Sequence, residues 1–396
     1  MRVAMVGPFG LRPRGTMSVR ALPMAQALVR RGHTVTLLLP PWQNPEDSGQ
    51  IGVQDGVTIE NVSLPPGIPL LFHALLTLRL ARRTLAVQPD VVHLFKPKAY
   101  SGLTHWLLAR LPRGRRPRLV VDTDDWEGSG GWNDLADYTA AQRRVFAWQE
   151  RWGLTHADAV TVASRTLESL VWALGVPPEQ VAYVPNGYPH PHLTPPSKLR
   201  TEPGEPLLLL YTRFFEFPVD RVVAVLRRVR ERVPEARLLV VGRGLFGEEE
   251  ELLAAARRAG LSQAVEYAGW VDPEDLPRAF ARAAVALYPF DDTLINRTKC
   301  PVKLLDLMSA GLPVVSEAVG EVREMIRDGR TGRLVAPGDA RAFSAAVVEL
   351  LEDPARRRQM GAAAMRDVQT RRNWDGLAEA VEMIYQDENH ASASVE

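Results

Sequence analysis

Short apolar runs alternate with amphipathic runs along almost the whole chain, and this alternation restricts the fold more than any other feature. The apolar runs are RVAMV, TVTLLL, DVVHLF, RLVV, DAVTVA and VAYVP in the first half, and PLLLLY, ARLLVVG, AVEYAG, VALYPF, LPVVS and GRLVA in the second. Helix-like stretches such as 17–31 and 72–86 separate them. Strands separated by helices predict parallel sheets built from right-handed crossovers, which is an α/β fold.

A proline-rich segment divides the chain into two parts of similar size. YPHPHLTPPSKLRTEPGEP, at 188–206, holds six prolines and one glycine, a composition typical of a connection between domains. A chain of 396 residues is also longer than one hydrophobic core usually serves. We predict a first α/β domain, a linker, a second α/β domain, a C-terminal helix and a disordered tail, at 1–188, 189–206, 207–370, 371–388 and 389–396.

The charge is divided unevenly between the two halves. Residues 1–200 hold 22 lysines and arginines against 15 acids, a net of +7, and the remainder holds 26 against 32, a net of −6. Two arginine clusters occur in the basic half, Arg79, Arg82 and Arg83, then Arg110, Arg113, Arg115, Arg116 and Arg118. Either they end solvated helices or they face an anionic surface, such as a bilayer with acidic lipids. No nucleic-acid-binding module accompanies them, so no nucleic-acid partner is expected.

Compartment is indicated by three features. The single cysteine, Cys300, excludes a disulfide framework and fits a reducing compartment. The opening MRVAMVGPFG is too short for a signal peptide and is typical of a first strand. No run reaches the ~18 apolar residues that a membrane span needs. We expect a cytoplasmic protein, with peripheral attachment to the inner membrane face left open by the arginine clusters.

The loop after the first strand, GPFGLRPRGT, is rich in glycine. Because ligands bind beyond the carboxyl ends of strands in open parallel sheets, loops of this kind are the places to search. Gly10 and Gly15 allow the backbone to approach an anion, and a helix begins at about Thr16. The spacing is not Gly-x-Gly-x-x-Gly, so nicotinamide or flavin binding is not expected. A plain turn is the alternative.

The acidic run DTDD follows the strand RLVV. Asp122, Asp124 and Asp125 could bind a divalent metal, contact sugar hydroxyls, or cap a helix without any chemistry. Contact with a ligand is favoured because the acids come directly after a strand.

The strand PLLLLY is followed by an arginine. Arg213 comes two residues after Tyr211 and could bind a phosphate through two parallel hydrogen bonds, unless Glu216 pairs with it.

The stretch NRTKCPVKLLDLM places two lysines near the start of a helix. Lys299 and Lys303 flank Pro301, a favoured first-turn residue, although cations there oppose the helix dipole. A bound diphosphate would offset that cost. Asp306, one turn beyond Lys303, could accept hydrogen bonds from a ribose diol or form an ion pair with Lys303.

The following stretch, VKLLDLMSAGLPVVSEAVGEVREMIRDGRTGRLVAPGD, resembles the C-terminal signature of retaining glycosyltransferases of the GT-B fold, in particular glycosyltransferase family 4 (glycosyl transferases group 1). VPNGY at 184–188 and RRGHTVTLL at 30–38 are similar to other parts of that family, so the resemblance covers almost the whole chain. The shared signature residues are Asp306, Ala310, Gly311, Pro313, Gly320, Glu324, Gly329 and Gly332.

The resemblance implies two Rossmann-like domains that face a cleft, with the last helix crossing back to the first domain. It implies transfer of a hexose-like sugar from a nucleotide-diphosphate donor to a hydroxyl of a glycan, lipid-linked or small-molecule acceptor, with retention of anomeric configuration. The donor is expected in the second domain and the acceptor in the first. Neither a catalytic metal nor another cofactor is expected.

The resemblance also implies roles for single residues. Asp306 would hold the ribose, Arg213 would meet the diphosphate, and the loop from Gly10 to Gly15 would close over the donor phosphates. Base recognition is placed near 241–244 and 267–270. The expected donor-binding residues are Gly10, Gly15, Thr16, Arg213, Gly242, Arg243, Asn296, Thr298, Lys299, Lys303, Leu304 and Asp306.

The chain departs from the family pattern at three positions. The first Glu of the Glu-x7-Glu pattern falls at Thr298, so either the donor sugar is held differently, by Asn296 or backbone N–H groups, or the enzyme is atypical. No lysine closely follows Arg213, and Lys299 and Lys303 are candidates to replace it. An acid, Asp124, stands where a family histidine is frequent.

These residues give a mechanistic hypothesis. Arg213, Lys299 and Lys303 would stabilise the charge of the departing diphosphate, and the acceptor would attack from the same face. Asp124 or His93, which matches another frequent family histidine, would orient the acceptor, although His93 could equally be a packed residue. The alternatives are a catalytically silent nucleotide-sugar or glycan-binding relative, a GT-B sugar-nucleotide epimerase and a phosphorylase.

Overall fold

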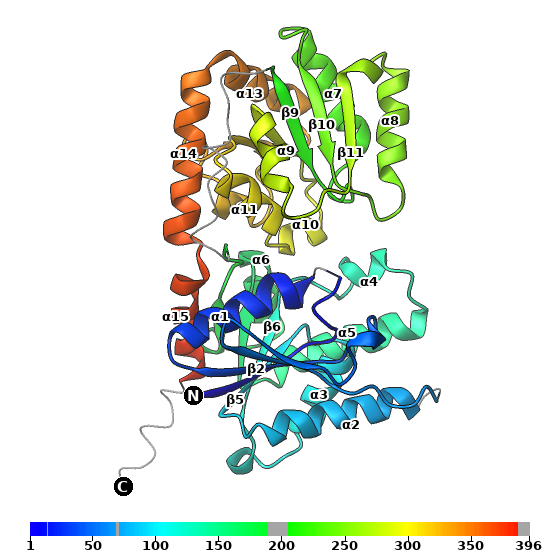
Figure 1. The fold of residues 1–396 in the computed structure, drawn as a ribbon, viewed down its shortest axis with the longest axis vertical. Coiled ribbons are helices and arrows are strands. Elements are labelled where there is room, and N and C mark those ends of the chain that lie inside the picture. The colour runs from blue at the N-terminus through cyan, green and yellow to red at the C-terminus, as the bar shows by residue number, and fades with distance from the viewer. Residues whose placement is uncertain (14, 69–70, 189–204, 387–396) are drawn as a thin grey trace. The chain divides into compact units, whose positions relative to one another are not determined.

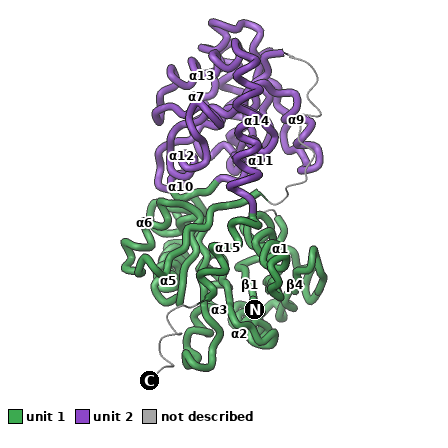
Figure 2. The backbone as a smooth tube through the Cα atoms, turned by 90° about the vertical axis from the view of Figure 1, so that its left-hand side faces the viewer, with its two compact units in different colours: residues 1–189, 298–300, 374–396 green, residues 190–297, 301–373 purple. Residues whose placement is uncertain are grey.

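The computed structural model describes residues 1–13, 15–68, 71–188 and 205–386 (Figure 1). The chain forms two compact units (Figure 2). Of the described residues, unit 1 contains 1–188, 298–300 and 374–386, and unit 2 contains 205–297 and 301–373. The predicted tail at 389–396 and all of the predicted linker except Glu205 and Pro206 lie outside the described residues.

Unit 1 contains an eight-stranded sheet with the order β3-β4-β2-β1-β5-β6-β7-β8. All neighbours are parallel except β3 and β4. The strands are β1 (Arg2–Val6), β2 (Thr34–Leu39), β3 (Ile51–Gln54), β4 (Val57–Asn61), β5 (Val91–Phe95), β6 (Arg118–Thr123), β7 (Ala159–Val162) and β8 (Val181–Tyr183). Each of the six apolar runs predicted in the first half forms a strand.

The antiparallel pair β3 and β4 was not predicted. Asp55 and Gly56 join the two strands with φ angles of 47° and 82°. A two-residue turn with both φ angles positive matches the twist of a hairpin, and Asp-Gly is a favoured sequence for it. The signal was therefore present in QDGV, but the run is too polar to resemble the buried strands around it.

Helices of unit 1 cover its sheet and include the last helix of the chain. α1 packs against α15, and α3 packs against both α2 and α5. A π-helix, η1, precedes α1 where one continuous helix was expected. The helices are η1 (Met17–Ala21), α1 (Leu22–Arg30), η2 (Pro45–Asp47), α2 (Leu71–Ala86), α3 (Ala99–Leu108), η3 (Arg113–Arg115), α4 (Trp132–Leu135), α5 (Ala140–Thr155), α6 (Arg165–Ala173), η4 (Pro178–Gln180) and α15 (Trp374–Tyr385).

Polar contacts and one buried ring fix α15 in unit 1. Arg30 lies 2.6 Å from Asp375, and His33 lies 2.7 Å from Glu382. Trp374, at the start of the helix, is 1% exposed and belongs to the same core as α1.

Unit 2 contains a six-stranded parallel sheet with the order β11-β10-β9-β12-β13-β14. Its strands are β9 (Leu207–Tyr211), β10 (Arg237–Val241), β11 (Val265–Gly269), β12 (Val285–Tyr288), β13 (Val314–Glu317) and β14 (Arg333–Val335). All six apolar runs predicted in the second half form strands, so the α/β prediction is confirmed for both sheets.

Helices surround this second sheet. They are α7 (Val219–Arg230), α8 (Glu248–Arg258), η6 (Ser262–Ala264), α9 (Leu276–Arg282), α10 (Leu294–Thr298), α11 (Val302–Ser309), α12 (Val322–Met325), α13 (Ala340–Glu352) and α14 (Pro354–Arg371). α10 occupies part of DDTLINRT, which was expected to be a loop. None of the helices in the described ranges is long and apolar enough to cross a membrane.

Candidate active site

The strand order of unit 2 reverses between β9 and β12. From β9 the chain proceeds through β10 and β11 to one edge of the sheet, and β12 then begins the other side. Loops that leave the two central strands diverge, and ligands of open α/β sheets bind at this point. A small pocket lies there. Its lining residues are Leu210, Tyr211, Thr212, Glu216, Phe217, Leu287, Tyr288, Pro289 and Lys303.

Lys303 brings a positive charge to the wall of this pocket. It is the second residue of α11, which follows Pro301. Its Nζ lies 3.4 Å from the centroid of the Tyr211 ring, and Tyr211 is the last residue of β9. The structure therefore places one of the predicted phosphate-binding lysines at the reversal of strand order.

Arg213 extends from the loop after β9 and is exposed. The next residue, Phe214, has a φ angle of 72°, and its N–H donates to Thr212 Oγ1 at 2.7 Å. A buried aromatic residue in the left-handed region is strained, and such strain often marks a functional loop. Within the described part of the chain Arg213 has no carboxylate partner, so the alternative of a pair with Glu216 is not found.

Asn296 ties together the two loops that border the pocket. Its Nδ2 donates to the carbonyl oxygens of Glu216, at 2.8 Å, and Asp291, at 2.9 Å. The side chain is buried, with 2% exposed. This burial corrects the expectation that Asn296 is open to the donor sugar, because its amide is used to hold the loops in place.

A buried carboxylate also supports the loop after β12. Glu317, the last residue of β13, accepts from the Phe290 N–H at 2.8 Å and pairs with Arg221 at 3.1 Å. Burial raises the pKa of Glu317 to about 6.

Two other residues of α11, Leu304 and Asp306, were predicted to bind the donor. Leu304 is 0% exposed, so its side chain cannot contact a donor. Asp306 lies one turn after Lys303 and is partly exposed, and its ribose contact stays a prediction.

Thr298 and Lys299 belong to unit 1, whereas Lys303 belongs to unit 2. Thr298 is 1% exposed, and its carbonyl accepts from Ser164 Oγ at 2.7 Å. Lys299 lies before the helix, with its Nζ 5.9 Å from the Trp132 ring. Lys299 therefore precedes α11 and Lys303 lies in its first turn, and their joint contact with a diphosphate stays a prediction.

Gly242 follows β10 and cannot be replaced without a clash. Its φ angle is 127°, and a Cβ atom there would lie 2.0 Å from the Thr212 carbonyl oxygen. Its N–H donates to the Gly269 carbonyl at 2.8 Å. Arg243 beside it is exposed and 3.8 Å from Glu249. The loops after β9 and β10 thus contact each other and the end of β11, and base recognition there stays a prediction.

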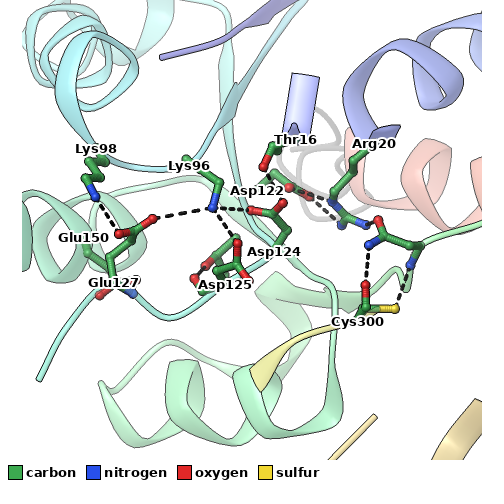
Figure 3. A network of polar contacts seen from close by, with 12 residues as sticks. Thr16, Arg20, Lys96, Lys98, Asp122, Asp124, Asp125, Glu127, Glu150 and Cys300 are labelled. Atoms are coloured by element: carbon green, nitrogen blue, oxygen red, sulfur yellow. Dashed lines mark hydrogen bonds and ion pairs between the residues drawn. The ribbon is translucent and has the colours of Figure 1, made fainter. Parts of the chain in front are cut away.

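In unit 1 a buried ion pair joins η1 to β6 (Figure 3). Arg20 Nε and Nη2 donate to the two carboxylate oxygens of Asp122 at 2.8 and 2.7 Å, and both side chains are 0% exposed. Arg20 also donates to Asn186 Oδ1 at 3.1 Å. Asn186 Nδ2 donates to the Cys300 carbonyl at 2.8 Å, which explains why 298–300 belong to unit 1. Asp122 is therefore not open to a ligand.

Lys96, at the end of β5, gathers the other acids of this edge (Figure 3). Its Nζ lies 3.1 Å from Asp124, 2.7 Å from Asp125 and 3.5 Å from Glu127. Thr16 Oγ1 donates to Asp124 Oδ2 at 2.6 Å. Burial alone would raise the pKa of Asp124, but the charges of Lys96 and Arg20 lower it overall. The structure thus brings together Thr16 and Asp124, which were predicted separately.

His93 lies inside the core of unit 1 and is 0% exposed. Its Nδ1 is 2.7 Å from the Tyr385 hydroxyl, and its Nε2 is 3.0 Å from Thr161 Oγ1. Burial lowers the pKa of His93 to about 3. It is therefore the packed histidine that the sequence left open, and the prediction that it orients an acceptor is corrected.

The glycine-rich loop and the DTDD run use their polar groups within unit 1. Gly10 is buried, and the Gly15 N–H donates to Ser18 Oγ at 3.0 Å. The carboxylates of the DTDD run contact Arg20, Thr16, Thr161 and Lys96. In the ranges that the structure describes, no group of three or more His, Cys, Asp or Glu side chains is arranged to hold a metal ion.

Solved structures define the class of this fold. The chain resembles sucrose-phosphate synthase from Thermosynechococcus elongatus with a TM-score of 0.75 and 22% identity, over 99% of this chain and 100% of that one. It resembles Anabaena Alr3699/HepE, solved in complex with UDP-glucose, with a TM-score of 0.68 and 18% identity, over 97% and 99% of the two chains. Two parallel α/β sheets of this kind are the GT-B fold.

Sequence comparison then gives the family. Residues 15–187 match the glycosyl transferase 4-like domain, and residues 205–353 match glycosyl transferases group 1. Phosphatidyl-myo-inositol mannosyltransferase from Mycobacterium leprae (strain TN) is 26% identical over 396 residues, covering 98% of this chain and 96% of the relative. The chain belongs to glycosyltransferase family 4 and is a nucleotide-sugar-dependent glycosyltransferase, as the sequence predicted.

Several residues of these sites were not predicted. Arg20 and Asp122 are about 100 residues apart, so their pairing is not visible in the sequence. Lys96 and Lys98 follow the strand DVVHLF at the same sheet edge as DTDD, and that adjacency could have indicated a neutralised cluster. Tyr211 was identified only as the end of a strand.

A buried acid at the base of the Lys96 cluster gives a pH-dependent prediction. Glu150 is 1% exposed, accepts from the Glu127 N–H at 2.9 Å, and has its pKa raised by burial to about 8. The carboxyl group of Glu150 therefore binds its proton more tightly in the folded state than in the unfolded state. Stability should fall as pH rises from the ordinary pKa of a glutamate through 8.

Glu150→Gln keeps a neutral acceptor and should remove part of this dependence. We expect the melting temperature of the wild type to fall by several degrees more than that of the variant between pH 6 and 9. Equal falls in calorimetric scans of the two proteins would contradict the assignment.

Proposed function

We propose that unit 2 binds the diphosphate of a nucleotide-sugar donor in the pocket between the ends of β9 and β12. The observation that carries this proposal is Lys303, a cation on the wall of a pocket at the reversal of strand order. Arg213, exposed on the loop that continues from the same strand, supplies a second cation. The names of relatives support a hexose donor, because one is a mannosyltransferase and another was solved with UDP-glucose.

The chemistry follows from the charge that develops on the leaving group. When the bond from the anomeric carbon to the diphosphate breaks, its electron pair stays with the phosphate oxygen. Fixed cations stabilise that charge more strongly in the transition state than in the bound donor. Lys303 and Arg213 would have this role, and Asp306 on α11 would accept hydrogen bonds from the ribose. The acceptor hydroxyl would attack from the face that the diphosphate leaves and would pass its proton to the departing phosphate oxygen, which gives the retention of the family.

Removal of the exposed cation tests the assignment. Arg213→Ala should lower kcat/KM for the donor by about 100-fold, the usual loss when one charge-stabilising donor is deleted. Stability should be unchanged, because the side chain is exposed and has no carboxylate partner in the described ranges. Arg228→Ala, an exposed arginine of α7 in the same unit, is the matched control. Turnover of the Arg213 variant at the control's rate would reject the role.

We propose also that the acceptor is presented at a membrane, with unit 1 in peripheral contact with anionic lipid through α2. Leu71, Leu78 and Leu85 are 46%, 49% and 38% exposed, and their seven-residue spacing puts them on one side of the helix. Arg82 lies among them, exposed and with no carboxylate partner in the described part of the chain. A helix with leucines and a cation on its outward face suits the interface of an anionic bilayer.

Some other arginines of the two clusters have partners within the protein, and others are exposed and could face an anionic surface. Arg83 is bonded to Glu60, Arg116 pairs with Asp158, and Arg110 lies over the Trp106 ring. Arg113 and Arg115 are exposed in the turn after α3, the helix that packs against α2. The lipid named in the Mycobacterium leprae relative supports an acceptor of this class.

Vesicle flotation tests this contact. The protein should float with vesicles that contain phosphatidylglycerol and remain below pure phosphatidylcholine vesicles. Leu78→Gln and Arg82→Gln should each weaken flotation several-fold. Met383→Gln, which alters an even more exposed apolar residue of α15, should not. If the protein does not float with anionic vesicles, or if neither α2 variant changes its flotation, the proposal is rejected.

A further inference from the structure

Tyr211 has two features that a simple pocket-lining residue does not need. Its ring is 6% exposed and rests against Phe280 of α9, with centroids 5.3 Å apart and planes at 59°. On the ring face lies Lys303 Nζ, 3.4 Å from the centroid. The aromatic ring is therefore fixed by a neighbour while it contacts a cation.

This contact has a physical consequence for the lysine. A lysine side chain has four rotatable bonds, and fixing it costs rotamer entropy. Lys303 is also on the first turn of α11, where the helix dipole disfavours a cation. An ammonium over the face of a tyrosine is attracted by the ring quadrupole, which opposes both effects.

We propose that Tyr211 is a positioning residue that holds the Lys303 ammonium in the pocket, where the diphosphate of the donor binds. This inference rests on the proposed function of that pocket. Because β9 also continues directly into Thr212 and Arg213, one short segment would then set the positions of both cations. Tyr211 itself does not touch the reacting atoms; it acts through Lys303.

A fluorination series at position 211 tests the proposal with little change of shape. Phenylalanine and its mono-, di- and trifluoro derivatives would be incorporated in the full chain, since each fluorine withdraws electron density from the ring face. Inorganic pyrophosphate and UDP serve as probes, with dissociation constants from calorimetry. We expect Tyr211→Phe to bind within about twofold of the wild type, and affinity to fall steadily across the series to roughly tenfold weaker.

The same series in the Lys303→Met background is the control. If Tyr211 acts through the lysine, fluorination should have no effect there, because the cation is absent. Equal slopes in the two backgrounds, or a flat series with Lys303 present, would overturn the proposal. A series that tightens with fluorination would also overturn it, because the ring would then hold the lysine away from the phosphate.

The two proposals fail in different ways. If Lys303→Met alone binds pyrophosphate and UDP like the wild type, the donor pocket is wrongly assigned, whatever the ring does. If Lys303→Met weakens binding and fluorination does not, only the role of Tyr211 is lost. Thermal unfolding of each variant establishes that the fold is intact, and the fluorinated proteins remain informative because the ring volume is nearly constant.

Discussion

In both units of this protein the first strand lies in the middle of the sheet, and this strand order determines where the loops separate. In unit 2 the first strand, β9, has β10 on one side and β12 on the other, and in unit 1 the first strand, β1, lies between β2 and β5. Right-handed crossovers then carry the chain in opposite directions from the central strand. The loops at the carboxyl ends separate at that point, and each unit places its charged residues there.

The two units use this edge differently. In unit 1 the charges are matched within the protein, because Arg20 neutralises Asp122 and Lys96 neutralises the acids around it. Removing either partner of the Arg20 pair would leave a fully buried charge, which typically costs about 3–5 kcal/mol. In unit 2 the edge holds Lys303 on a pocket wall and Arg213 on an exposed loop. The first arrangement fixes a scaffold, and the second is where we propose that the diphosphate binds.

The sequence was sufficient for the fold because the buried parallel strands are continuous apolar runs, which periodicity detects directly. It failed at the β3 and β4 hairpin, whose exposed residues lack such a run. For the site, Arg213 and Lys303 both lie in unit 2, and their contact with a donor stays a prediction. Position after a strand could not separate ligand-facing from buried residues: His93 and Leu304 have suitable positions, but burial removes them from any ligand. Burial and long-range pairing depend on packing, which no local pattern encodes.

The central claim is that a nucleoside diphosphate binds at the ends of β9 and β12. Amide hydrogen exchange of the full chain, with and without UDP or GDP, tests it directly because ligand binding suppresses local opening of the segments it contacts. We predict slower exchange in 212–217 and 289–306, the loops and helix start around the pocket. Unchanged exchange there, with protection confined to the loops of unit 1, would contradict the account.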